Sequence, residues 1–236
     1  MNEHQLVASS RQILTHNFCD LDHVVSGLSL RVADRPERSH DGSVSSIWAE
    51  PSGTDDDSAD HVLVRAARLG DRDAFDAIVQ RHGPGMYRFA LRMVGGHASD
   101  AAEIVQESFV SAWKNIATFE ARSSLKTWLY RLVTRRAADL QRKRKPTPVD
   151  ADFLAAVTPP ASSDPLQSVM NAELVVALQA ALAELTWEQR AVWLLREIEG
   201  MSYDEMATTL AMTPDSVRGQ LHRGRHNLAE RMAQWR

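Results

Sequence analysis

Cysteine is almost absent from this 236-residue chain, since Cys19 is the only one. One thiol excludes an intramolecular disulfide and a zinc site built from several cysteines. The sequence also lacks an apolar run of about 18 residues and the basic start and apolar core of a signal peptide. It contains no glycine loop that would hold phosphate, no cluster of metal ligands and no nucleophile with a nearby base. We therefore expect a cytoplasmic protein that is not an enzyme, holds no cofactor or metal, and is not inserted into a membrane.

Strand alternation and internal repeats are missing as well, whereas apolar residues recur at helical spacing over most of the chain. The sequence therefore predicts an all-α protein. Helical spacing begins at His61 and continues to Lys145, with predicted breaks at "HGPG" (82–85) and "GGHASD" (95–100). A second helical block fills Leu166–Arg236.

Two segments without helical spacing flank these blocks. Residues 1–60 end in "EPSGTDDDSAD", and we expect a disordered acidic N-terminal extension because this composition opposes a packed core. The stretch Pro146–Pro165 contains five prolines, which predicts a flexible linker over residues 147–168. The chain is thus predicted to form two small helical domains, 61–146 and 169–236, joined by this linker.

The charged residues are distributed unevenly, although the formal net charge of the chain is only −4. Residues 1–60 carry 4 basic and 11 acidic side chains, whereas residues 61–146 carry 16 basic and 8 acidic ones. Residues 147–170 carry 3 acidic and no basic side chains, and residues 171–236 carry 7 basic and 9 acidic ones. A polyanion responds to local charge, so the segment 61–146, at net +8, is the candidate for contact with nucleic acid.

An amphipathic helix is predicted in "SDAAEIVQESFVSAWKNI", with Ser99 as its N-cap. Its apolar face consists of Ala101, Ile104, Val105, Ser108, Phe109, Ala112 and Ile116. The opposite face carries Glu103, Gln106, Glu107, Val110 and Lys114. From the pattern alone, this polar face is either an ordinary solvated surface or a surface for a partner.

A basic helix is predicted next, in "SSLKTWLYRLVTRRAADLQRKRK", with Ser123 or Ser124 as its cap. Its polar side carries a cationic ridge of Arg131, Arg135, Arg142 and Lys145. Such a ridge is suited to a phosphate backbone. Arg136 falls within the apolar stripe instead, so its guanidinium either extends to solvent or pairs with an acid of a neighbouring helix.

Three aromatic residues, Phe119, Trp128 and Tyr130, lie in and just after the loop before this helix. They are interleaved with Arg122, Lys126 and Arg131. An aromatic ring among cations provides a surface for an unstacked base, worth about 1–3 kcal/mol per base. Each ring taken alone is equally consistent with a packing role, so only the combination indicates contact with single-stranded nucleic acid.

The C-terminal block contains three predicted helix starts. The capping residues are Thr186 with Gln189, Ser202 with Glu205, and Thr213 followed by Pro214 at the first helical position. The helix that begins after Ser202 is separated by a short turn from the helix that begins at Pro214. This spacing is typical of a helix-turn-helix.

The second helix of this motif has a polar face opposite its apolar stripe. That face carries Ser216, Gly219, His222, Arg223 and His226, with Arg218 and Arg225 flanking it. An arginine there can donate two hydrogen bonds to a guanine in the major groove, and Gly219 would let the helix backbone approach DNA closely. A merely basic surface helix is the alternative, and it does not account for the short turn and the caps.

Three stretches match a known family in order and spacing: "DAAEIVQESFVSAW", "SSLKTWLYRLV" with its basic tail, and "GMSYDEMATTLAMTPDSVRGQLHRGRHNL". Over residues 61–236 the chain resembles the extracytoplasmic-function (ECF, group 4) sigma factors of the sigma-70 family, the promoter-specificity subunits of bacterial RNA polymerase. The resemblance implies sigma domain 2 over 61–146, for core polymerase binding and for recognition and melting of the minus-ten element. It implies sigma domain 4 over 169–236, for recognition of the minus-thirty-five element.

The same resemblance assigns roles to individual residues. It implies that core polymerase is bound by Asp100, Glu103, Gln106 and Glu107. It implies minus-ten DNA binding by Phe119, Arg122, Lys126, Trp128, Tyr130, Arg131, Arg135 and Arg142, and minus-thirty-five DNA binding by Ser216, Arg218, Gly219, His222, Arg223, Arg225 and His226. The implied partners are core RNA polymerase through its beta and beta-prime subunits, promoter DNA and, as a further plausible partner, an anti-sigma factor.

We therefore predict an alternative sigma factor that directs promoter-specific transcription initiation by recognising both elements. The first rival hypothesis is a stand-alone helix-turn-helix transcriptional regulator. It is less consistent with the acidic N-terminal segment and with a net charge of −2 over residues 171–236, because solitary DNA binding depends on neutralising phosphates. The second rival, a nucleic-acid-processing enzyme, requires a catalytic constellation that the sequence lacks.

Overall fold

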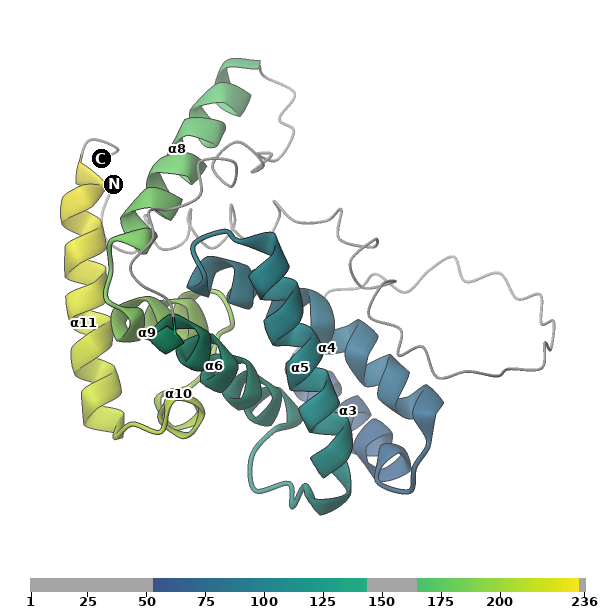
Figure 1. Ribbon diagram of the computed structural model, residues 1–236. Helices are drawn as coiled ribbons and strands as arrows, with labels where there is room; N and C mark the ends of the chain where they lie inside the picture. Colours follow the sequence, from purple (N-terminus) through teal and green to yellow (C-terminus); the bar gives the residue numbers. More distant parts are fainter. Residues whose placement is uncertain (1–52, 144–164, 234–236) are drawn as a thin grey trace.

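The structure is a computed structural model that describes residues 53–143 and 165–233. Regular structure in these ranges is entirely helical, which confirms the all-α prediction, and no helix in them is both long and apolar enough to cross a membrane. The first range forms α3 (Gly53–Ala67), α4 (Arg72–Met93), α5 (Ala98–Asn115), the short turn η1 (Ile116–Thr118) and α6 (Leu125–Lys143). The second forms α8 (Pro165–Ala183), α9 (Trp187–Glu197), α10 (Tyr203–Leu210) and α11 (Pro214–Arg231) (Figure 1).

Helices α3 to α6 form the first module, a bundle in which α4 packs on α3 and α5, and α5 packs on α6. Aromatic rings fill its centre: the ring of Phe75 meets the rings of Phe109 and Trp113 edge-on, at 6.3 and 4.9 Å between centroids. The apolar stripes predicted for α5 and α6 face this core, with Val105 and Leu129 fully buried. Burial of these stripes stabilises the bundle.

Helix α4 runs without interruption through residues 82–85, so the break predicted at "HGPG" is wrong. Pro84 lacks an amide proton and normally weakens a helix interior. Here Ile78 and Met86, one on each side of it, are fully buried in the same core. Packing of this face outweighs the local preference for a turn, because most helical stability in a folded protein comes from tertiary contacts.

The break predicted at 95–100 is confirmed, but its capping residue is not Ser99. Gly95 and Gly96 adopt φ values of +70° and +94°, which glycine reaches without strain. The chain returns to helical geometry soon afterwards, with His97 as the N-cap of α5. Ser99 therefore lies in the first turn of the helix.

The N-terminal boundary of the first module also differs from the prediction. The last residues of the expected extension, 53–60, belong to α3. Asp60 anchors them: it is 5% exposed, and its carboxylate lies 3.0 Å from His82 Nε2 and 3.3 Å from Arg81 Nε. This tertiary contact joins residues 22 positions apart. The predicted extension up to residue 52 and residues 147–164 of the predicted linker lie outside the described residues. So do residues 144–146 of the predicted first domain, which include Lys145 of the predicted cationic ridge.

The second module, α8 to α11, contains the predicted helix-turn-helix. Each predicted N-cap is present. The hydroxyl oxygens of Thr186, Ser202 and Thr213 each accept a hydrogen bond from the amide three residues later, at 3.3, 3.3 and 3.2 Å. Glu205 completes a capping box by accepting from the Ser202 amide at 2.8 Å. Ala211 closes α10 in the left-handed conformation, with φ of 53°. Helix α8 begins at Pro165, one residue before the predicted start of the second helical block.

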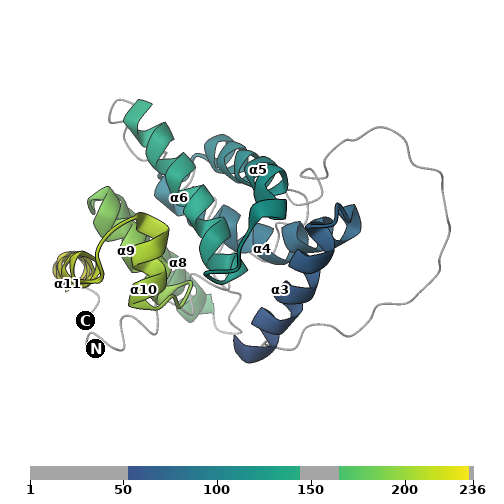
Figure 2. The same cartoon turned by 90° about the horizontal axis from the view of Figure 1, so that it is seen from below.

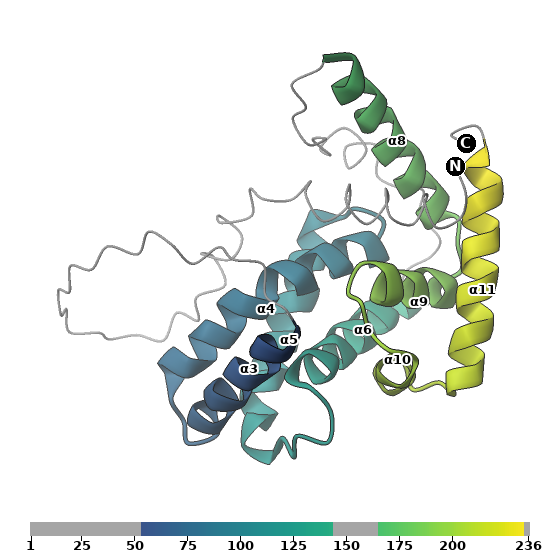
Figure 3. The same cartoon turned by 180° about the vertical axis from the view of Figure 1, so that it is seen from behind.

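The two modules are in direct contact, and we call this contact the junction. Helix α6 lies against α10, α4 lies near α9, and α11 is on the outside of the molecule (Figures 2 and 3). Buried apolar residues on both sides belong to one continuous cluster, which includes Leu129 of α6 and Met206 of α10.

The side chain of Arg190 in α9 contacts the ends of two helices, α8 in its own module and α4 across the junction. Its guanidinium donates hydrogen bonds to the carbonyls of Leu182 at 2.8 Å and Ala183 at 2.5 Å, in the last turn of α8. It also donates to the carbonyl of Met93, the last residue of α4, at 3.3 Å. The last carbonyls of a helix have no partner within it, so one side chain satisfies the ends of α8 and α4 together.

Candidate functional site

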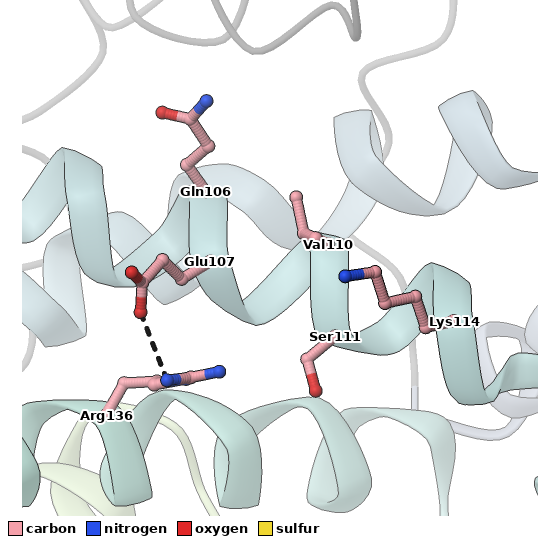
Figure 4. A pocket seen from close by; sticks show the side chains of 6 residues that line it. All are labelled: Gln106, Glu107, Val110, Ser111, Lys114 and Arg136. Atoms are coloured by element: carbon pink, nitrogen blue, oxygen red, sulfur yellow. Dashed lines mark ion pairs between the residues drawn. The ribbon is translucent and has the colours of Figure 1, made fainter.

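The polar face of α5 forms the first candidate surface. Glu103, Gln106 and Glu107 are exposed, as a protein-binding surface requires. Next to them a shallow hollow is lined by Gln106, Glu107, Val110, Ser111, Lys114 and Arg136 (Figure 4). The hollow lies between α5 and α6 and carries charges of both signs.

Arg136 of α6 reaches across to α5, and its Nη1 lies 3.2 Å from Glu107 Oε2 (Figure 4). Of the two placements left open by the sequence, pairing with an acid of a neighbouring helix is the one observed. Both side chains remain about half exposed, at 44% and 50%. Such a pair stabilises the fold little, so either group can change partners when another surface docks.

Asp100 does not lie on this surface. It is only 8% exposed and sits in the first turn of α5. A carboxylate at the N-terminus of a helix interacts favourably with the helix dipole. The placement favours a role in the start of α5 over the predicted contact with polymerase.

The aromatic residues before and within α6 form the second candidate surface. Phe119 is 7% exposed and packs against the half-buried Trp128, with ring centroids 4.9 Å apart. Tyr130 is 2% exposed and packs edge-on against Phe89 at 5.4 Å. Trp128 is therefore the ring that retains surface for a base, whereas Tyr130 is enclosed in this arrangement.

Cations surround these rings unequally. Arg131 and Arg135 are exposed on α6. Arg122 pairs with Glu120, and Arg142 with Asp139, but their side chains remain 85% and 73% exposed. Lys126 is different because it contacts the second module: its Nζ donates to the carbonyl of Glu199 at 2.8 Å.

The third candidate surface is the outer face of α11. Arg218, His222, Arg223 and His226 are exposed, and Ser216 and Gly219 are half-buried. The Arg223 guanidinium lies over Gly219, where an added Cβ would be 3.6 Å from it. Gly224, on the opposite side, lets α11 approach α9, since a Cβ there would lie 3.4 Å from the Gln189 carbonyl oxygen. The outer face is thus backed by α9 and remains exposed.

Arg225 faces inward from α11 rather than toward this open surface. Its Nε and Nη2 lie 2.9 and 2.5 Å from Oε1 of Glu197, whose side chain is 8% exposed. This pair braces α11 against α9. The placement differs from the predicted DNA contact, because helical register alone did not reveal a buried carboxylate on the next helix.

Comparisons with known proteins identify the family. Sigma-70 region 2 matches residues 78–147, and Sigma-70, region 4 matches residues 176–228. The ECF RNA polymerase sigma factor SigE of Mycolicibacterium smegmatis is 32% identical over 193 residues, which cover 80% of this chain and 72% of SigE. SigW of Bacillus subtilis, also an ECF RNA polymerase sigma factor, is 30% identical over 177 residues, covering 72% of this chain and 94% of SigW.

The chain belongs to the ECF RNA polymerase sigma factors.

Solved structures agree with the fold of this sigma factor. CnrH, solved in complex with the cytosolic domain of CnrY, is 27% identical with a TM-score of 0.56, and the match covers 75% of this chain and 98% of CnrH. The sigma factor RpoE of Bartonella quintana, solved with the anti-sigma factor NepR, has a TM-score of 0.53 at 21% identity and supports the fold alone; that match covers 67% of this chain and 96% of RpoE.

Family membership makes this protein an alternative sigma factor that directs promoter-specific transcription initiation. The region 2 match covers most of α4 and all of α5 and α6, and the region 4 match runs from α8 into α11. A stand-alone helix-turn-helix regulator is not favoured, because it would not account for the first match.

One feature of this sigma factor's helix-turn-helix was missed from the sequence. Two guanidinium groups lie over the ring of Tyr203, the first residue of α10, with Arg196 at 5.1 Å and Arg218 at 5.4 Å from its centroid. A tyrosine directly after a capping box was the available signal. The stacking fixes Arg218 at the edge of the α11 face.

Proposed function

We propose that this ECF sigma factor binds core RNA polymerase with the first module, reads the minus-ten element with the segment Phe119–Lys143, and reads the minus-thirty-five element with α11. In family terms, the first module acts as sigma domain 2 and the second as sigma domain 4. The observation that carries the proposal is the presence of all three polar surfaces on the two modules that match regions 2 and 4.

Core polymerase is proposed to dock on the polar face of α5 through its beta-prime subunit, with the beta subunit as a further contact. Glu103, Gln106 and Glu107 supply exposed acceptors there. The Glu107–Arg136 pair can reopen at little cost because both groups are half exposed.

Minus-ten recognition is proposed to use Trp128 as the stacking surface and Arg122, Arg131, Arg135 and Arg142 as phosphate contacts. Stacking and phosphate neutralisation together favour the unpaired strand. Binding energy would then drive the separation of the DNA strands, so we propose no catalytic step by this chain. We propose that the protein acts in the cytoplasm.

Minus-thirty-five recognition is proposed to use Ser216, Arg218, Gly219, His222, Arg223 and His226. Their face is polar and is supported from behind by the α9–α11 contact at Gly224. Arginine on a major-groove helix reads guanine through two hydrogen bonds.

Run-off transcription with purified core polymerase tests the proposal. The wild-type chain should yield promoter-selective transcripts, and Glu107→Lys should reduce them by weakening core binding. Asp76→Lys, which makes the same charge change at an exposed position of α4, is the matched control. A specific footprint by the chain alone, without selective transcription on adding core, would favour the stand-alone regulator instead.

A further inference from the structure

Two arginines of the second module lie over one tyrosine ring. Tyr203 is the first residue of α10, and the guanidinium carbons of Arg196 and Arg218 lie 5.1 and 5.4 Å from the centroid of its ring. Both distances are within the range in which a cation is attracted to the face of an aromatic ring. Arg196 belongs to α9 and Arg218 to α11, so this ring connects three helices.

Local contacts hold the backbone around Tyr203 in place. Ser202, the residue before it, is the N-cap of α10 and forms a capping box with Glu205. Arg196 Nη1 donates a hydrogen bond to the carbonyl of Met201 at 2.7 Å. The Tyr203 ring itself packs against the buried apolar cluster. The ring therefore has a defined position before DNA binds.

Arg218 lies at the edge of the exposed α11 face and has two contacts within the fold. Its guanidinium forms an ion pair with Asp215, three residues earlier, while its side chain remains 57% exposed. Asp215 is 91% exposed, and an ion pair between such exposed groups fixes a side chain only weakly. The half-buried ring of Tyr203 is the steadier of the two contacts.

The orientation of an arginine matters for how it reads DNA. Fixing the rotamers of this long side chain costs conformational entropy, and a side chain that is ordered before binding loses less entropy on contact with DNA. The planar guanidinium reads guanine through two parallel hydrogen bonds, which require a set orientation of its plane. A support beneath that plane therefore increases affinity and selectivity at the base it contacts.

We propose that Tyr203 is a positioning residue for minus-thirty-five recognition, whose ring orients the Arg218 guanidinium to read one base pair in the major groove. Tyr203 acts through Arg218, so the face of the ring is required and the hydroxyl group is not. The inference rests on the proposed function, because it deepens the assignment of α11 to the minus-thirty-five element.

The test uses holoenzyme assembled from the full-length chain and purified core polymerase. The holoenzyme transcribes a library of bar-coded promoters randomised at both elements, and sequencing of the transcripts gives the base preference at each position. Arg218→Ala should lower the preference at one minus-thirty-five base pair roughly tenfold, as expected for the loss of a two-bond contact with a base. Tyr203→Leu, which keeps an apolar side chain but removes the ring, should lower the same preference about threefold.

Two further variants test whether the ring acts through the arginine. Tyr203→Phe retains the ring and should match wild type within about twofold. Tyr203→Leu combined with Arg218→Ala should lose no more preference than Arg218→Ala alone. A loss in Tyr203→Phe would indicate a direct contact of the hydroxyl group with DNA and overturn the proposal. Additive losses in the double variant, or an equal loss at every position in Tyr203→Leu, would overturn it as well.

Trp187→Leu is the matched control for removal of an aromatic ring from the same module. Trp187 is half-buried at the start of α9, near the C-terminal half of α11, where Asn227 Nδ2 donates to Gln189 Oε1 at 3.1 Å. Equal losses at the same base pair in Trp187→Leu and Tyr203→Leu would reduce the effect to destabilisation and overturn the proposal. Circular dichroism melts verify folding, and Tyr203→Met carries the test if Tyr203→Leu does not fold.

The base preferences of wild type separate this inference from the proposed function. A wild-type holoenzyme without preference at any minus-thirty-five position overturns the proposed role of α11, and the inference with it. A changed preference in Arg218→Ala with an unchanged one in Tyr203→Leu overturns the inference alone.

Discussion

The basic helices α6 and α11 differ in how many of their polar side chains are contacted by the rest of the fold. On α11, Arg218, His222 and Arg223 are exposed. On α6, Lys126 is engaged by Glu199 and the buried Thr134 by Thr209, whereas Arg131 and Arg135 remain exposed. Both helices have the composition of a nucleic-acid reader, and only their packing separates them. The junction thus covers Lys126 and leaves the arginines of α6 exposed like those of α11.

The largest expected effect comes from removing a core side chain of α9, the helix against which α11 packs. Trp193 of α9 is 2% exposed. Trp193→Ala should lower the free energy of unfolding by about 3–5 kcal/mol, as is typical of a large buried aromatic residue, and minus-thirty-five binding should be lost with it. Urea unfolding followed by circular dichroism measures the loss. A change under about 1 kcal/mol would contradict a core role for Trp193.

Arg225→Ala tests the packing of α11 against α9, as distinct from the proposed contact of α11 with DNA. It leaves the Glu197 carboxylate buried without its cation, which costs about 3–5 kcal/mol at a fully buried site. Because the Arg225 side chain is 37% exposed, we expect a loss of about 2 kcal/mol in the free energy of unfolding. Arg231→Ala, which breaks an exposed pair with Glu184, is the control and should cost under about 0.5 kcal/mol.

Arg223→Ala, on the same helix, should weaken promoter recognition and leave the free energy of unfolding nearly unchanged. Its side chain is exposed, so the free energy of unfolding should stay within about 0.5 kcal/mol of wild type. Promoter use should weaken by about 1–3 kcal/mol at one minus-thirty-five position. Transcription from promoters substituted at each position measures this, and an equal loss on every sequence would indicate a phosphate contact.

Gly85→Ala should disturb the covered face instead. Its Cβ would lie 2.8 Å from Tyr130 Oη, which forces Tyr130 or the turn at Glu199 to move, and we expect a loss of about 1 kcal/mol in the free energy of unfolding. Gly83→Ala is the control, because its Cβ would meet Phe109 at an ordinary 3.7 Å. That variant should gain stability through the higher helix propensity of alanine. Equal changes in both would contradict a tight contact at Gly85.

The smallest expected effect concerns pH at the edge of the junction. Burial raises the pKa of Glu205, but hydrogen bonds from Ser202 and Thr127, with Lys126 nearby, outweigh it and lower the pKa below its usual 4.5. A depressed pKa in the folded state adds stability above pH 4.5 that is lost as the pH falls through the folded value. Unfolding of Glu205→Gln should therefore depend less on pH below 4.5 than that of wild type. Identical pH profiles would contradict this contribution.

Much of the fold follows from local patterns. Apolar spacing identified the buried faces of α5 and α6, and the caps at Thr186, Ser202 and Thr213 located three helix starts. Such patterns work because caps and stripes depend on residues three or four positions apart. The same logic placed the open face of α11 correctly on the surface.

The rest depends on contacts between distant residues, which periodicity does not encode. Helix α4 continues through Pro84 because its faces are buried, and α3 extends to Asp60 and beyond because Asp60 meets His82. Lys126 and Glu199 are 73 positions apart. A helical pattern states which face is buried without stating which partner covers it, so the covering of α6 was not foreseeable from the sequence.

The Arg190 contact described above also bears on how this sigma factor unfolds. When the last turn of α8 loosens, the guanidinium that holds the Leu182 and Ala183 carbonyls is released, and the carbonyl of Met93 at the end of α4 loses its donor too. We therefore expect fraying of one helix to weaken the end of another that lies about ninety positions earlier in the chain. If Arg190 couples the two modules in this way, local opening on one side should lower protection against amide hydrogen exchange on the other.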